Sequence, residues 1–70
     1  MAQRTTGTVR WFDGSRGYGY IKTEKGHEVF VHYSSIVGSD LQNLREGERV
    51  EFAVEETVRG LQATGVVRLI

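Results

Sequence analysis

Hydrophobic and polar residues alternate along five short segments of this chain. These segments, residues 6–12, 17–23, 28–33, 48–54 and 61–69, are rich in β-branched and aromatic residues. Polar, mostly glycine-containing turns lie between them, which is typical of β-strands joined by turns. Polar residues and a glycine interrupt residues 34–44, so we expect a loop there with at most one turn of 3₁₀ helix. The pattern predicts an all-β fold of five strands.

The alternation also sorts the side chains of each strand into two faces. In residues 17–33 one face is aromatic and cationic and consists of Tyr18, Tyr20, Lys22, Phe30 and His32. The opposite face is small and aliphatic and consists of Gly19, Ile21, Val29 and Val31. In the fourth strand Val50, Phe52 and Val54 share a side, so Phe52 is the one aromatic residue predicted to lie in the core.

A five-stranded sheet without covering helices can bury only one face, which it does by closing into a barrel. We therefore expect the aliphatic face inside and the aromatic face exposed. Six of the seven aromatic residues fall within residues 11–33, interleaved with Arg10, Arg16, Lys22 and His32. Exposed aromatic side chains among cations bind unpaired bases by stacking, at about 1–3 kcal/mol per base.

The alternative is a β-sandwich in which the aromatic side chains form the second half of the core. Three features disfavour it. Arg16, Lys22 and His32 would be costly to bury on that face, and the hydroxyls of the two tyrosines need hydrogen-bond partners. Gly17 and Gly19 suit a close approach of backbone better than packing.

Composition narrows the class of protein further. Seventy residues predict one domain spanning residues 1–70. The chain has no cysteine, and its two histidines have no partners at metal-ligand spacing, so we expect no disulfide, metal or other cofactor. No apolar run reaches the length of a membrane helix or a signal peptide, so we expect no membrane association. A cytoplasmic monomer is the resulting prediction.

The net charge is zero, but the two halves of the chain differ. Residues 1–33 hold five Lys and Arg against three Asp and Glu, and residues 34–70 hold four against six. The aromatic half is therefore the basic half. Because this asymmetry is modest, we expect any affinity for nucleic acid to depend more on stacking than on counterion release.

Other functions fit the sequence less well. His32 and Ser34 share a strand face, but no activating acid or oxyanion feature accompanies them, so we predict neither an enzyme nor a small-molecule substrate. A reader of duplex DNA would need a helix or basic ribbon for the major groove. A protein-interaction barrel that grips a peptide with its aromatic face stays open as the alternative.

Three sequence motifs point to a family. They are residues 7–12 (GTVRWF), 16–21 (RGYGYI) and 29–34 (VFVHYS), followed by Glu46-Gly47 and Gln62-Ala63. Together they closely resemble the bacterial cold-shock proteins over essentially the whole chain. The resemblance implies a small five-stranded antiparallel OB-fold barrel that binds single-stranded RNA and DNA without ATP or metal. It also implies a role as an RNA chaperone or in cold-shock-type gene regulation.

The resemblance further implies which residues bind. The residues expected to stack on successive bases are Trp11, Tyr18, Phe30, His32 and Tyr33, with Tyr20 and Phe12 contributing from the strand edges. The residues expected to contact phosphates or base edges are Arg10, Arg16, Arg59 and Gln62. The chain departs from the family pattern at Asp13, usually asparagine, at Leu41, usually phenylalanine, and at Leu61, often proline. The first two departures are expected to lower affinity.

Overall fold

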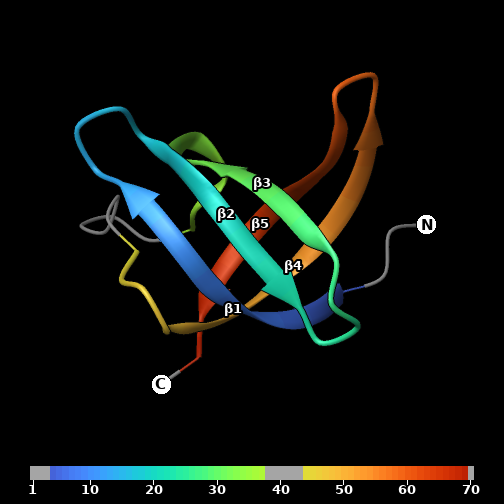
Figure 1. Cartoon of the computed structure of the whole chain (residues 1–70), viewed down its shortest axis with the longest axis horizontal. Helices are drawn as coiled ribbons and strands as arrows, with labels where there is room; N and C mark the ends of the chain where they lie inside the picture. Colours follow the sequence, from blue (N-terminus) through green and yellow to red (C-terminus); the bar gives the residue numbers. More distant parts are fainter. Residues whose placement is uncertain (1–3, 38–43, 70) are drawn as a thin grey trace.

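The computed structural model describes residues 4–37 and 44–69, and shows five strands and one short 3₁₀ helix in them (Figure 1). The elements in chain order are β1 (Arg4–Asp13), β2 (Tyr18–Thr23), β3 (Glu28–His32), η1 (Tyr33–Ser35), β4 (Arg49–Thr57) and β5 (Gly60–Arg68). The all-β prediction is confirmed. Tyr33 begins η1 and does not lie in the third strand, because the His32 side chain caps a turn there. Leu41 lies outside the described residues.

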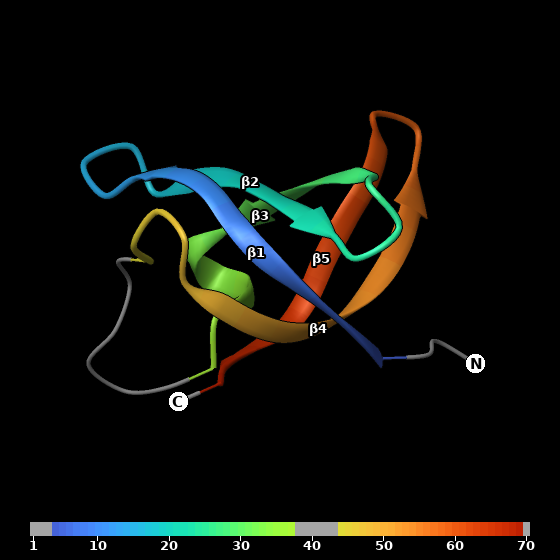
Figure 2. The same ribbon diagram turned by 60° about the horizontal axis from the view of Figure 1, so that its bottom comes forward.

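The strands form a closed barrel in the order β1-β2-β3-β5-β4, with the β4–β5 hairpin extending beyond it (Figure 1, Figure 2). Four of the five pairings are antiparallel. The fifth, between β3 and β5, is parallel and joins Phe30 to Gln62. An odd number of strands cannot alternate in direction around a closed ring, so the antiparallel barrel expected from sequence contains one parallel seam.

The barrel interior is filled by aliphatic side chains and one aromatic ring. The buried apolar residues are Val9, Ile21, Val29, Val31, Leu44, Val50, Phe52, Ala63 and Val66. The face assignments in the second, third and fourth strands are confirmed, including the burial of Phe52. The sandwich alternative is wrong, because the sheet closes on itself and its other face is the outside of the barrel.

Two glycines near Tyr18 allow close packing within the protein. A Cβ on Gly19 would lie 2.2 Å from the Trp11 carbonyl oxygen, so Gly19 lets β1 and β2 approach each other. A Cβ on Gly17, whose φ is +79°, would lie 2.5 Å from the Tyr33 ring. The close approach expected at both glycines is therefore made by the chain itself.

A β-bulge in β1 decides which aromatic residues face outward. The register with β2 shifts between Val9 and Trp11, and this extra residue turns Arg10 and Trp11 outward together. Trp11 then pairs with Tyr20, and Phe12 pairs with the buried Gly19. Strict alternation from the buried Val9 would have put Trp11 inside.

Candidate nucleic-acid interface

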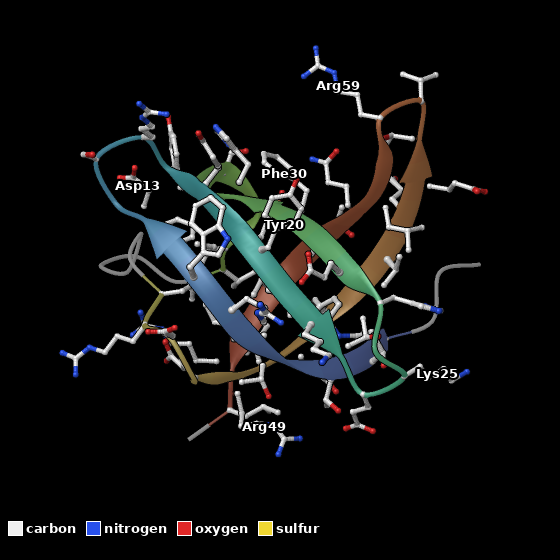
Figure 3. All side chains as sticks on the ribbon, viewed as in Figure 1. Asp13, Tyr20, Lys25, Phe30, Arg49 and Arg59 are labelled. Carbon is white, nitrogen blue, oxygen red and sulfur yellow. The ribbon has the colours of Figure 1, made fainter. Side chains whose placement is uncertain are left out.

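Four aromatic rings meet on the outside of β1, β2 and β3. The ring centroid of Trp11 lies 5.9 Å from that of Tyr18 and 5.7 Å from that of Tyr20. The ring centroid of Phe30 lies 5.7 Å from the centroid of each of these tyrosines. Figure 3 shows Tyr20 and Phe30 close together in front of the barrel. We name these four rings, together with His32 and Tyr33, the aromatic platform.

The platform is accessible although its rings contact one another. Trp11 is 43% exposed and Tyr33 is 45% exposed, whereas the core ring Phe52 is fully buried. Tyr18, Tyr20 and Phe30 are partly buried, since each packs in a T-shaped or tilted arrangement against its neighbours. A contiguous exposed aromatic surface of this kind is typical of a binding site.

Phe12 does not belong to this platform. It is partly buried and packs against the core cluster, because the bulge in β1 turns it toward the same side as Gly19. The expectation that Phe12 contributes a stacking surface from the strand edge stays a prediction, and in the structure its ring also extends the core.

His32 and Tyr33 form the end of the platform next to η1. Their ring centroids lie 4.5 Å apart with an interplanar angle of 33°. The backbone N–H of Ser34 donates to His32 Nδ1 at 3.2 Å, and the Ser34 hydroxyl lies 2.8 Å from the same nitrogen. The Tyr33 N–H donates to the Gly17 carbonyl at 2.9 Å. These contacts hold both rings in place before any ligand binds.

Two of the predicted phosphate-binding arginines are paired with carboxylates of the chain. Arg10 lies 3.5 Å from Glu28, and Arg16 lies 3.8 Å from Asp13. Arg16 also donates to the Tyr18 hydroxyl at 3.2 Å, so it lies across the edge of the platform. Exposed ion pairs of this kind contribute little stability.

Asp13 organises the turn between β1 and β2. Its Oδ1 accepts from the Ser15 hydroxyl at 2.7 Å, the Ser15 N–H at 3.0 Å and the Arg16 N–H at 3.2 Å. Hydrogen bonds from the Ser15 hydroxyl and the Arg16 N–H lower the pKa of the Asp13 carboxyl below its ordinary value of 3.8. The sequence placed Asp13 in a turn and identified it as an anion beside the binding face, but the hydrogen bonds of its carboxylate were not predicted. An aspartate followed by Gly-Ser is a signal for such a turn.

We expect Asp13→Asn to be less stable than the wild type at neutral pH, by a difference that disappears in acid. The folded-state pKa of Asp13 lies below its unfolded value, so its stabilisation is present above the unfolded pKa and is lost as pH falls through the folded pKa. Asparagine keeps an acceptor for the turn but carries no charge. Urea unfolding of both proteins over a pH series measures the difference, and a constant difference across the acidic range would contradict the argument.

A hollow of about 470 Å³ lies beside Phe30, between β3 and the β4–β5 hairpin. Its lining residues are Tyr20, Phe30, His32, Ser34, Thr57, Arg59, Leu61 and Gln62. The parallel seam between β3 and β5 brings together Gln62 and Phe30, two residues of the predicted binding set. Arg59 lies near the tip of the hairpin (Figure 3). Ser34, Thr57 and Leu61 were not predicted as site residues, since only the folded hairpin brings Thr57 and Leu61 to this place.

Within residues 4–37 and 44–69, no group of three or more His, Cys, Asp and Glu side chains could hold a metal ion. In the same part of the chain, no helix has the length and apolar character needed to cross a membrane.

The family model and the relatives that match this chain carry the same family description. A family model described as 'Cold-shock' DNA-binding domain matches residues 5–69. Cold shock-like protein CspE of Bacillus anthracis is 48% identical over 64 residues, covering 91% of this chain and 96% of the relative. The Major cold shock protein of Streptococcus pyogenes serotype M6 is 48% identical over 69 residues, covering 99% of this chain and 98% of the relative. The solved structure described as drosophila Unr CSD456 has a TM-score of 0.80 at 23% identity, over 97% of this chain and 27% of that chain. At this sequence identity, the similarity to the solved structure shows a shared fold only.

Proposed function

Since this chain belongs to the cold-shock DNA-binding domain family, we propose that it binds single-stranded RNA and DNA by stacking bases on its aromatic platform. The observation that carries the proposal is the set of four rings, each in contact with two of the others, on the outside of a closed barrel. Each stacked base contributes about 1–3 kcal/mol with little demand on sequence.

The platform favours unpaired strands because a base in a duplex has no free face to stack on a ring. When an RNA hairpin opens transiently, the platform captures the released bases and shifts the population toward the open form by its differential affinity. In this proposal the protein is an RNA chaperone that acts as a cytoplasmic monomer, with no cofactor and no catalytic step.

The arginines around the platform guide the phosphate backbone. Arg10 and Arg16 exchange their carboxylate partners, Glu28 and Asp13, for phosphates. Arg59 reaches the strand from the hairpin. Because the exchange replaces one ion pair by another, it adds little net attraction, and stacking supplies most of the affinity.

We expect the fluorescence of Trp11 to be quenched when an oligothymidine is added. Trp11 is the only tryptophan of the chain and is 43% exposed at the platform, so a stacked base changes its surroundings directly. Titrations with oligothymidine, oligoadenosine and the matching duplex measure the effect, and the duplex is expected to bind much more weakly. Unchanged emission at saturating oligonucleotide would count against the platform.

A peptide-binding barrel would respond differently in the same assay. A proline-rich peptide that lies on the rings would also quench Trp11 and would compete with the oligonucleotide. Under the proposed function, the peptide neither quenches the emission nor displaces the bound strand.

A further inference from the structure

An ion pair crosses the outside of β2 where the aromatic platform ends. Arg10 belongs to β1 and Glu28 to β3, and β2 lies between these two strands in the barrel. The Arg10 guanidinium reaches the Glu28 carboxylate at 3.5 Å. Glu28 pairs with Lys22 across the β2–β3 ladder. The ion pair and Lys22 therefore lie together, directly past Tyr20, the last ring on β2.

Lys22 lies on the same outer face as the platform rings. In β2, Gly19 and Ile21 are buried, whereas Tyr20 is partly buried and Lys22 is exposed. Successive side chains of a strand point to opposite faces, so Lys22 follows Tyr20 on the outside at a spacing of about 7 Å. A lysine has a flexible four-carbon stem, so its ammonium can reach the backbone of a nucleic-acid strand that stacks on Tyr20.

The charge of Lys22 is not compensated by a carboxylate. In the part of the chain that the structure describes, its ammonium makes no ion pair. Arg10 and Arg16 differ in this respect, because they are paired with Glu28 and Asp13. The carboxylate of Glu28 is already engaged by Arg10, so Lys22 does not serve as its cross-strand partner. This end of the platform holds two cations and one anion, whereas the charges of Arg16 and Asp13 cancel at the other end.

We propose that Lys22 binds a phosphate of the single strand, and that the binding site extends past the rings to this end of β2. A base stacked on Tyr20 or Trp11 brings the neighbouring phosphate toward Lys22, where the uncompensated ammonium attracts it. Lysine binds phosphate as a compact point charge with three N–H donors. The family resemblance did not indicate Lys22 as a binding residue. This inference rests on the proposed function.

The test compares oligothymidine binding by Lys22→Gln and the wild type over a series of salt concentrations. One phosphate contact on a single strand contributes about 0.7 to the slope of log K against log salt, so we expect the slope of the variant to be shallower by about that amount. The loss of affinity is then about eightfold larger at roughly 0.05 M salt than at roughly 1 M. Lys22→Arg keeps the charge and is expected to retain most of the slope. The quenching of Trp11 at saturation is expected to be unchanged, because the rings are intact.

Lys25→Gln is the matched control. Lys25 is the only other lysine of the chain and is exposed in the turn between β2 and β3, where Figure 3 shows it pointing away from the barrel. Among the described residues it also has no ion-pair partner. The two glutamine variants therefore make the same chemical change and the same change in net charge, and only Lys22→Gln is expected to lower the slope. Urea unfolding of each variant measures any separate loss of stability.

The proposal is overturned if Lys22→Gln shows the salt slope of the wild type, whatever its stability. It is also overturned if Lys25→Gln lowers the slope by the same amount, because the effect then depends on the net charge of the protein and not on a contact at Lys22. In both cases the proposed function stands, since the strand still quenches Trp11. If oligothymidine does not bind the wild type at all, the proposed function fails first and the phosphate contact with it.

Discussion

Phe52→Ala is expected to lower the free energy of unfolding by about 3–5 kcal/mol, the range for removing a buried aromatic ring. Phe52 is among the largest fully buried side chains and belongs to the core cluster. A domain of this size has a total stability of only about 4–10 kcal/mol, at roughly 0.05–0.15 kcal/mol per residue. Urea unfolding followed by circular dichroism measures the loss, and much of the variant is expected to be unfolded at moderate temperature.

The matched control is Phe52→Leu, which keeps most of the buried apolar volume. Its cost is expected to be clearly smaller than that of the alanine variant, since cavity volume determines much of the loss. If Phe52→Ala unfolds at the same urea concentration as the wild type, the ring contributes no core packing and the inside and outside of the barrel have been assigned wrongly.

Phe30→Ala is expected to weaken binding of a single-stranded oligonucleotide by about 1–3 kcal/mol, the contribution of one stacked base. Phe30 lies at the middle of the platform, with ring neighbours on two sides, and next to Gln62 across the seam. Because it is only partly buried on the outside of the barrel, the loss in folding stability is expected to be much smaller than for Phe52→Ala. Fluorescence titration of Trp11 and urea unfolding measure the two quantities on the same protein.

The two phenylalanine variants test opposite faces of one sheet. Phe30→Ala must reduce binding per folded molecule, and Phe52→Ala must reduce the folded fraction. If Phe30→Ala unfolds the protein while the remaining folded molecules bind normally, Phe30 is a packing residue and the platform cannot be the binding surface.

The sequence alone was enough for the strands and for most of the faces. Alternation in β2 and β3 separates Tyr18, Tyr20 and Phe30 from Ile21 and Val31, because successive side chains of a strand point to opposite sides. Burial follows from this local geometry together with the hydrophobic effect. The platform rings of these strands and the buried Phe52 were therefore predictable without any knowledge of the fold.

The tertiary structure decided what depends on register and on distant parts of the chain. The bulge in β1 turns Trp11 outward and Phe12 inward, and no local pattern predicts it, because an extra residue in one strand exists only relative to its partner strand. The pairing of Arg10 with Glu28 likewise requires strands that meet only after folding. The barrel's closure aligns β3 with β5 and brings Gln62 to Phe30. Sequence alternation is a property of one strand, whereas register, ion pairing and the hollow beside Phe30 are properties of strand pairs, and these are set by the packing of the whole barrel.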